Sequence, residues 1–371
     1  MVNKRKILLF CSSLNKGGTE RVVVNLAEYL LKQGIQVVLV TQYRYENEYK
    51  LSEGILRILS EPSDEELPGN RIGNFRVRYR KLRKIWKEQR PDCILSFIGK
   101  NNFMALGAAV FTHIPVVVSV RGEPKSEYAS PMMKLISKTL FAASAGIILQ
   151  TQKAKAFFPF YLRKKAVILK NPLDPDFVRP RFTGKRNGQI VAVGRVDENK
   201  NHEMIIRAFA RITKDFPDTT LKIYGDGDCR TRLQRLVEEL GLADRVSLPG
   251  VQENIPDKLY ESSIFVLSSN SEGMPNALLE AMCMGIPSIS TDCPCGGPGE
   301  LIKDGVNGFL IPVGGEQELE SRLRILLQDE KKAEEMGKQA AKLLEEYRPD
   351  VVNRQWLDYL MSRGRGNSCV E

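Results

Sequence analysis

At 371 residues, of which 42% are hydrophobic and 27% charged, the chain has the composition of an ordinary soluble protein and is long enough for two cores, so two domains are expected. Its net charge of +10 is unevenly distributed, because residues 1–172 hold 29 Lys/Arg and 13 Asp/Glu whereas residues 173–371 hold 26 and 32. The basic half suggests an anionic partner, namely a membrane surface, a nucleic acid or a phosphorylated acceptor.

No segment predicts a membrane span or a cleaved leader. The longest apolar region, residues 103–120, is interrupted by polar residues and a proline. The basic and apolar start of the chain lacks a small-residue cleavage site, so a buried first strand is expected there. Seven scattered cysteines favour a reducing compartment, and Cys293 with Cys295 is too small a set for a zinc site. We therefore expect a cytoplasmic protein.

Strand-like and helix-like segments alternate along the first half of the chain, which predicts a parallel sheet with right-handed crossovers. The expected strands are 7–11, 36–41, 93–97, 116–120, 146–149 and 166–169. The expected helices are 19–32, 72–89, 101–111, 132–143 and 153–158.

A Pro/Asp-rich segment, residues 171–176, separates this series from a second one and is interpreted as a hinge. The domains are therefore placed at 1–172 and 173–349, with a terminal helix, about 350–362, that can pack back on the first domain. The second series has expected strands at 189–193, 221–224, 246–248, 264–267 and 288–290, and helices at 201–214, 229–240, 276–284, 316–327 and 331–347.

Two glycines, Gly17 and Gly18, follow the first expected strand and precede a helix. Glycines at a helix start let backbone N–H groups approach an anion, although glycine pairs serve in turns about as often. The chain has neither the G-x-G-x-x-G fingerprint of dinucleotide-binding proteins nor the G-x-x-x-x-G-K-[ST] loop of ATPases, so both interpretations lose their usual support.

Residues 71–90 are expected to form a basic amphipathic helix with one acid, Glu88. One interpretation is a solvated surface helix held by its apolar stripe. The other is attraction to anionic lipid, about 1 kcal/mol per basic residue near the surface. A second basic patch, residues 153–170, surrounds aromatic residues that could touch an interface. The helix carries the basic residues Arg71, Arg76, Arg78, Arg80, Lys81, Arg83, Lys84, Lys87 and Arg90 and the apolar stripe Phe75, Tyr79, Leu82 and Trp86.

A phosphate site is indicated by Arg195 and Lys200, which follow the first strand of the second series. Arginine can form two parallel hydrogen bonds to phosphate oxygens, and lysine adds a point charge. A cation beside a helix amino terminus is unfavourable for the helix alone, which favours a bound anion there over a mere surface pair.

Two glutamates, Glu272 and Glu280, flank the start of the helix expected at 276–284, with Pro275 as its first residue. The backbone N–H groups of Asn276 and Ala277 would then be unpaired donors that suit a phosphate. Carboxylates so close to a phosphate would repel it, so the two glutamates are expected to face neutral hydroxyls such as those of sugars. The two histidines, His113 and His202, lack a hydrolase-triad or metal-ligand context.

Taken together, these residues resemble the retaining GT-B glycosyltransferases of family 4. The resemblance implies two Rossmann-like domains with parallel sheets facing each other across a cleft, the first binding the acceptor and the second the nucleotide sugar. Within that family, the chain is similar to bacterial transferases that build capsular, exopolysaccharide or lipid-linked oligosaccharide chains. It spans nearly the whole chain and is carried by Glu272 and Glu280 with seven residues between them, Gly194-Arg195 with Lys200, Gly17-Gly18 and the Asn171-Pro172 hinge.

The resemblance implies three catalytic residues. Arg195 and Lys200 would stabilise the negative charge that grows on the leaving pyrophosphate, and Glu272 would bind hydroxyls of the transferred sugar. The resemblance also implies metal-independent chemistry, so neither a metal nor another cofactor is expected, the nucleotide sugar being a substrate.

Further donor-binding positions are implied in the same way. Glu280 would bind the ribose hydroxyls, Val251 would lie near the base, and the backbone at Met274, Asn276 and Ala277 would meet the distal phosphate or sugar. Gly17 and Gly18 would approach the same phosphate from the first domain. One departure concerns a histidine that many relatives carry after the fourth strand, where this chain has Arg121, the candidate for that role, and Glu123, a candidate for acceptor contact.

The expected function is retaining transfer from a nucleotide diphosphate sugar, with uridine the usual base in this family, to a membrane-associated glycan or lipid-linked acceptor. The enzyme would lie on the inner face of the cell membrane. A nucleotide-sugar epimerase on the same scaffold is the alternative, although no acid–base His/Asp set is evident. A nucleic-acid binder is suggested only by the basic half, and without an aromatic RNA-binding strand or a zinc finger no nucleic-acid partner is expected.

Overall fold

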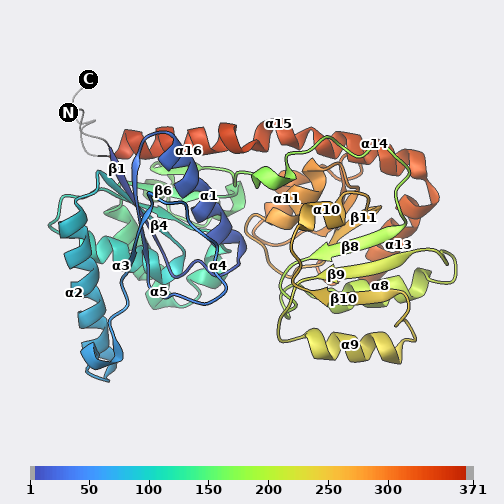
Figure 1. The fold of residues 1–371 in the computed structure, drawn as a ribbon, viewed down its shortest axis with the longest axis horizontal. Coiled ribbons are helices and arrows are strands. Elements are labelled where there is room, and N and C mark those ends of the chain that lie inside the picture. Colours follow the sequence, from blue (N-terminus) through green and yellow to red (C-terminus); the bar gives the residue numbers. More distant parts are fainter. Residues whose placement is uncertain (1–4, 365–371) are drawn as a thin grey trace. The chain divides into compact units, whose positions relative to one another are not determined.

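The computed structural model describes residues 5–364, which form two compact units (Figure 1). Unit 1 consists of Met1–Pro172 together with Asp350–Glu371, and unit 2 of Leu173–Pro349. Each unit is a parallel sheet between helices, which confirms the predicted α/β class. Within the described residues, no helix has the length and apolar character that crossing a bilayer requires.

The sheet of unit 1 has seven parallel strands in the order β3-β2-β1-β4-β5-β6-β7. Its strands are β1 (Lys6–Cys11), β2 (Gln36–Thr41), β3 (Leu56–Leu59), β4 (Cys93–Phe97), β5 (Val116–Ser119), β6 (Gly146–Leu149) and β7 (Ala166–Ile168). Its α-helices are α1 (Gly18–Lys32), α2 (Arg71–Gln89), α3 (Gly99–Ala109), α4 (Pro124–Glu127), α5 (Pro131–Ala142), α6 (Gln152–Ala156), α7 (Phe160–Arg163) and α16 (Pro349–Arg363).

The sheet of unit 2 has six parallel strands in the order β10-β9-β8-β11-β12-β13. Its strands are β8 (Gln189–Val193), β9 (Thr220–Tyr224), β10 (Val246–Gly250), β11 (Ile264–Leu267), β12 (Ser288–Thr291) and β13 (Phe309–Ile311). Its α-helices are α8 (His202–Ile212), α9 (Arg230–Glu239), α10 (Ile255–Leu259), α11 (Asn276–Cys283), α12 (Gly297–Leu301), α13 (Glu316–Gln328), α14 (Glu330–Ala341) and α15 (Leu343–Tyr347).

The central strands are buried on both faces, which explains their continuous apolar runs. In β1, Leu8 and Phe10 belong to the core that contains Trp86 of α2. Ile7 and Leu9, which alternate with them, belong to the core that contains Trp356 of α16.

Several local predictions were wrong at the edges of elements. The edge strands β3 and β13 were not expected, and β3 contains Arg57 and has no buried residue. The helix expected at 331–347 is divided into α14 and α15, and the one expected at 153–158 ends at Ala156, with α7 following separately. Pro275 is the N-cap of α11 and not its first helical residue.

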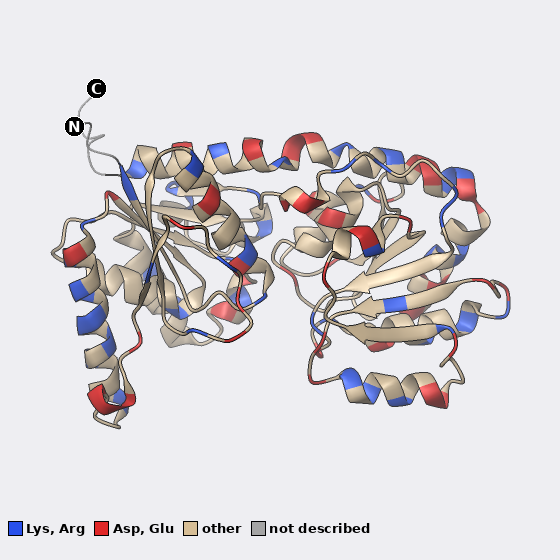
Figure 2. Cartoon of the chain, viewed as in Figure 1, with Lys and Arg blue, Asp and Glu red and all other residues tan. Residues whose placement is uncertain are grey.

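The basic helix α2 packs through only part of its apolar stripe. Leu82 and Trp86 are buried, whereas Ile72 and Phe75 in the first turns are 69% and 55% exposed. Figure 2 shows Lys and Arg repeated along this helix. The helix therefore presents both cations and apolar side chains to solvent at its amino-terminal end.

Replacing Trp356 by alanine should lower the free energy of unfolding of unit 1 by about 3–5 kcal/mol. The indole is fully buried, stacks on Phe97 with ring centroids 6.1 Å apart and donates from Nε1 to the carbonyl of Lys170 at 2.9 Å. Urea denaturation would measure the loss. Arg354→Ala, on the exposed side of the same helix, should cost less than about 1 kcal/mol, and equal losses would contradict the packing role.

The folding of unit 2 should weaken between pH 6.5 and pH 4 because of His202. This imidazole is 4% exposed, and burial, helped by the nearby Lys200 charge and opposed by Asp197, lowers its pKa to about 4. Below pH 6.5 the His202 imidazole is protonated in the unfolded chain, whereas in the folded protein it stays neutral until about pH 4. About 3 kcal/mol of the free energy of unfolding is therefore lost across this window.

Thermal or urea unfolding at a series of pH values would test this expectation. His202→Gln should remove this part of the acid sensitivity, since glutamine does not titrate. His113→Gln, at an exposed position of unit 1, is the matched control and should leave the unit 2 transition as in the unchanged protein. An acid sensitivity that persists in His202→Gln would contradict the assignment.

Candidate active site

The candidate site of unit 2 forms where the strand order of its sheet reverses. From β8 the chain proceeds outwards to β9 and β10, and then returns to place β11, β12 and β13 on the other side of β8. The loops that follow β8 and β11 therefore meet at the carboxyl edge of neighbouring strands, the position at which ligands bind in open α/β sheets.

Asn199 joins these two loops. Its backbone carbonyl accepts a hydrogen bond from the N–H of Asn270 at 2.7 Å. Its side-chain amide accepts from the N–H of Ser271 at 3.1 Å and donates to the carbonyl of Ser271 at 3.0 Å. Asn199 was not among the site residues expected from the sequence, although its place between Arg195 and Lys200 is a signal that could have indicated it.

Lys200 and Glu272 are brought into contact by this junction. Lys200 Nζ forms an ion pair with Glu272 Oε1, and the two side chains are only 16% and 13% exposed. The lysine stem runs over Gly194, where an added Cβ would lie 3.1 Å from Lys200 Cε. The backbone N–H of Lys200 is capped by Asp197 Oδ1 at 3.0 Å. A cation and a carboxylate are thus fixed side by side at the carboxyl edge of the sheet.

Arg195 lies in the same loop but is not enclosed. Its side chain is 78% exposed, and among residues 5–364 its only ion pair is a 3.3 Å contact with Asp197. An exposed pair of this kind contributes about 0–1 kcal/mol, so the guanidinium can turn towards a ligand at little cost.

The helix α11 begins directly after the glutamate-bearing loop. Its N-cap residue, Pro275, provides no side-chain cap, and no acidic residue lies in its first turn. Met274 is 7% exposed, and Asn276 and Ala277, the first helical residues, are half-buried. The amino end of this helix therefore keeps its positive electrostatic character for a ligand.

Glu280 lies in the second turn of α11 and is 4% exposed. Its charge, together with burial as the larger cause, raises the pKa of the neighbouring Cys283 thiol to about 12. Val251 follows β10 at the same edge of the sheet and is 64% exposed. Glu280 and Val251 thus both come after the carboxyl ends of strands, β11 and β10, in the sheet that carries Lys200.

In unit 1 the residues singled out from the sequence again follow strands. Gly17 is the N-cap of α1 and Gly18 its first residue, and the Glu20 carboxylate folds back over Gly17 so closely that a Cβ there would overlap it. The loops after β1 and β4 are joined by Asn101, whose Nδ2 donates to Ser12 Oγ at 2.9 Å.

Arg121 is held inside unit 1 rather than on its surface. It is 6% exposed, and Nη2 donates to Asn171 Oδ1 at 2.6 Å. Its guanidinium carbon lies 6.0 Å and 5.7 Å from the ring centroids of Phe97 and Trp356. Burial lowers its pKa to about 9, an effect that the Glu20 charge partly opposes. Contact between Arg121 and a ligand would therefore require the side chain to leave these partners.

Two carboxylates follow Arg121 on this edge. Glu123 is half-buried, and its Oε2 accepts from Ser126 Oγ at 2.6 Å. Glu127, which the sequence analysis did not single out, accepts from the backbone N–H of Gly99 and from Tyr128 OH. Burial raises the pKa of Glu127, so this carboxyl is harder to ionise than an exposed one.

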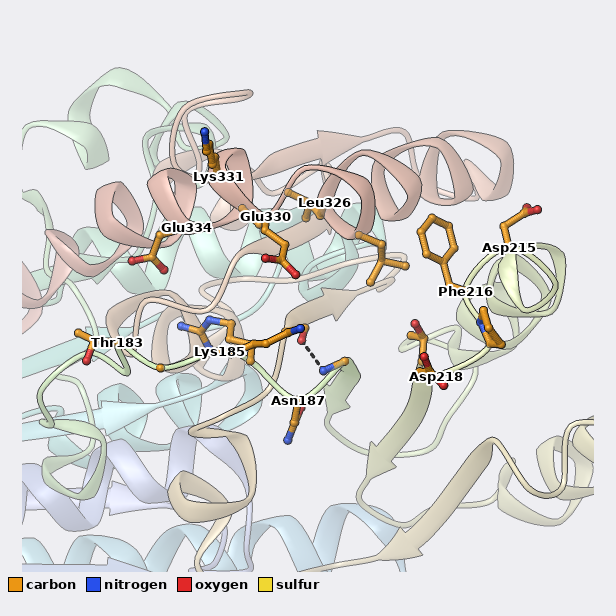
Figure 3. Close-up of a pocket in the computed structure, with 18 residues that line it drawn as sticks. Thr183, Lys185, Asn187, Asp215, Phe216, Asp218, Leu326, Glu330, Lys331 and Glu334 are labelled. Atoms are coloured by element: carbon orange, nitrogen blue, oxygen red, sulfur yellow. Dashed lines mark hydrogen bonds between the residues drawn. The ribbon is translucent and has the colours of Figure 1, made fainter.

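A cavity of about 920 Å³ in unit 2 lies away from this site (Figure 3). Its lining includes Gly188, Thr219 and Ser263, which immediately precede β8, β9 and β11, so it opens at the amino edge of the sheet. Figure 3 shows Glu330 and Glu334 above Lys185 across this space. Because Lys200 and Glu272 lie at the carboxyl edge, this cavity is separate from the candidate site.

Within residues 5–364, no group of three His, Cys, Asp or Glu residues could hold a metal.

Two family descriptions match adjoining parts of the chain. Residues 16–177 match Glycosyltransferase Family 4, and residues 177–343 match Glycosyl transferases group 1. Unit 1 and unit 2 thus each correspond largely to one of the two descriptions.

Two relatives from Campylobacter jejuni align over almost the full length. One is named GalNAc-alpha-(1->4)-GalNAc-alpha-(1->3)-diNAcBac-PP-undecaprenol alpha-1,4-N-acetyl-D-galactosaminyltransferase and is 24% identical over 95% of this chain and 97% of its own. The other, N-acetylgalactosamine-N,N'-diacetylbacillosaminyl-diphospho-undecaprenol 4-alpha-N-acetylgalactosaminyltransferase, is 26% identical over 96% and 100%.

A solved structure shares the fold. Anabaena HepE in complex with UDP superposes with a TM-score of 0.80 at 19% identity and covers 96% of this chain and 100% of its own. With two parallel-sheet units, two contiguous family matches and glycosyltransferase relatives along its full length, the chain belongs to the GT-B glycosyltransferases of family 4.

Proposed function

We propose that the protein is a retaining glycosyltransferase that moves a sugar from a UDP-sugar to a lipid-linked or glycan acceptor at a membrane, in the synthesis of a bacterial surface polysaccharide or glycan. The observation that carries the proposal is the placement of Lys200 and Glu272 side by side at the carboxyl edge of unit 2, next to the start of α11. UDP as the carrier is supported by the solved relative that holds UDP, and a lipid-linked acceptor by the names of the two Campylobacter relatives.

The donor phosphates would lie between Lys200, Arg195 and the amino end of α11. Together these groups supply a half-buried ammonium, an exposed guanidinium and helix N–H donors to the same small region. They meet the charge that grows on the leaving diphosphate, where preorganised electrostatics lower the barrier most. Because this positive charge is already present in side chains and backbone, we propose that transfer needs no metal or other cofactor.

The two glutamates would bind the sugars of the donor. Glu272 touches Lys200, so its carboxylate lies where the transferred sugar follows the phosphate. Glu280, one helical turn further into α11, would take the ribose hydroxyls, and the exposed Val251 would lie beside the base. Carboxylates accept hydrogen bonds only, which suits hydroxyl donors.

In the proposed reaction the acceptor hydroxyl attacks the anomeric carbon from the face that the diphosphate leaves. The new carbon–oxygen bond forms as the bond to the phosphate oxygen breaks, and the acceptor proton passes to a phosphate oxygen of the departing UDP. Configuration is then retained and charge balances without a protein base. Gly17 and Gly18 of α1 would add backbone donors from unit 1, and Arg121 and Glu123 would lie on the acceptor side.

Peripheral binding to the inner face of an anionic membrane is part of the proposal. Besides α2, unit 1 has a stretch, residues 128–172, with eight Lys/Arg and no Asp/Glu. In this stretch Met132 and Leu135 of α5 and Phe160 and Tyr161 of α7 are 52–67% exposed. Cations around exposed apolar side chains are what an anionic lipid surface attracts.

Lys200→Ala should reduce sugar transfer at least 100-fold, because the substitution removes the ammonium that faces the leaving group. Purified protein would be assayed with UDP-sugars and acceptor, with the anomeric configuration of the product read by NMR. Lys214→Ala, at an exposed lysine after α8, is the matched control and should keep wild-type rates. Undiminished transfer by Lys200→Ala would overturn the mechanism, and an epimerised sugar formed without acceptor would favour the epimerase.

Vesicles containing about 30% anionic lipid should sediment the protein at least tenfold better than neutral vesicles, since each basic residue near the surface contributes about 1 kcal/mol. The triple variant Arg71→Glu/Arg76→Glu/Arg80→Glu should abolish most of this preference.

The matched control reverses the charge of three exposed basic residues of unit 2 by replacing Lys214, Arg235 and Lys258 with glutamate. This control should sediment like the wild type if unit 1 carries the lipid surface. Equal binding of the wild type to anionic and neutral vesicles would contradict the membrane proposal without touching the transfer chemistry.

A further inference from the structure

Besides its ion pair with Lys200, the Glu272 carboxylate accepts a hydrogen bond from Ser269, and this second contact determines which carboxylate oxygen is left for a ligand. Ser269 Oγ lies 2.6 Å from Glu272 Oε1, the same oxygen that pairs with Lys200 Nζ. A carboxylate cannot donate, so the serine hydroxyl is the donor. No described residue hydrogen-bonds to Oε2. One oxygen is therefore anchored by the protein and the other remains for a substrate hydroxyl.

Ser269 is itself fixed from the neighbouring strand. Its backbone carbonyl accepts from Thr291 Oγ1 at 2.6 Å and from Cys293 Sγ at 3.2 Å. All three residues are fully buried. Burial raises the pKa of Cys293 to about 11, so the thiol stays a protonated donor at neutral pH. The end of β12 thereby holds the loop after β11 in place.

We propose that Ser269 is a positioning residue for the transferred sugar: it holds Glu272 so that Oε2 faces a hydroxyl of the nucleotide-bound sugar. The inference rests on the proposed function, because it assigns Glu272 to that sugar. When the diphosphate arrives, Lys200 is drawn to it and releases Oε1. The Ser269 hydroxyl then remains as the contact that keeps Glu272 in its orientation.

This role predicts different effects on the two parts of the donor: the contact with the sugar is weakened, and binding of the nucleotide is not. Loss of the Ser269 hydroxyl disturbs only Glu272, whereas the diphosphate keeps Lys200, Arg195 and the start of α11. Ser269→Ala should therefore lower kcat/KM for a UDP-sugar about tenfold, within the range expected for one hydrogen bond to a charged group. The Kd of UDP alone should stay within twofold of the wild type.

The experiment is a double-mutant cycle with Ser269→Ala, Glu272→Ala and both together. Rates are measured with UDP-glucose, UDP-N-acetylglucosamine and UDP-N-acetylgalactosamine, and the affinity for UDP by calorimetry. If Ser269 acts through Glu272, the serine substitution costs less than twofold once Glu272 is absent. A tenfold loss in both backgrounds, or weakened UDP binding, would show a general structural role and overturn the inference.

Ser288→Ala is the matched control. Ser288 is equally buried, begins β12 at the opposite end of the strand, and donates to the Ile286 carbonyl at 2.9 Å. It should leave kcat/KM unchanged, and thermal melting would confirm that all variants are folded. If the wild type transfers sugar and Ser269→Ala does so at the same rate, this inference is overturned and the proposed function is not. A wild type that neither binds nor uses any of the UDP-sugars overturns the proposed function together with it.

Discussion

The contact between Lys200 and Glu272 depends on two strands that are remote in sequence lying next to each other. The partners are 72 residues apart, and they meet only because β8 and β11 are neighbours at the point where the strand order reverses. Parallel strands end at the same edge of a sheet, so every loop that follows a strand in unit 2 is delivered to this edge. The remaining features of the site, from Asn199 to the start of α11, follow from that single topological constraint.

Close packing of backbone makes this junction possible. Gly225 has φ +136°, and a Cβ at this position would overlap the carbonyl of Gly194 in the loop that leads to Lys200. A Cβ at Gly297 would likewise overlap the carbonyl of Gly273, beside Glu272. Loops from four strands can approach one another here because side chains are absent at the contact points. The polar residues are then held by backbone that has little freedom to move.

Unit 1 uses the same sheet architecture with different chemistry. Its carboxyl edge contains a buried guanidinium, Arg121, whose only hydrogen-bond partner in the described part of the chain is the neutral Asn171 and whose flat faces lie against Phe97 and Trp356. Burying a charge without a carboxylate is costly, and the lowered pKa of Arg121 reflects this cost. The last helix, α16, contributes the indole, so the end of the chain helps to form the interior of the first unit. The excess positive charge of unit 1 lies elsewhere, on α2 and on residues 128–172.

The sequence by itself determined the class of fold and the positions of most central elements. Short apolar runs such as Ile264–Leu267 predict buried strands, and glycine, glutamate and basic residues after strands indicate a ligand edge. It could not show that Lys200 touches Glu272, that Asn199 and Ser269 fix this pair, or that Arg121 is enclosed by Trp356, which lies more than 200 residues away. Periodicity and spacing report local structure, because they depend on neighbours within a few residues. Contacts between remote loops, and the burial of a charged side chain, are decided by strand order and packing, which only the tertiary structure contains.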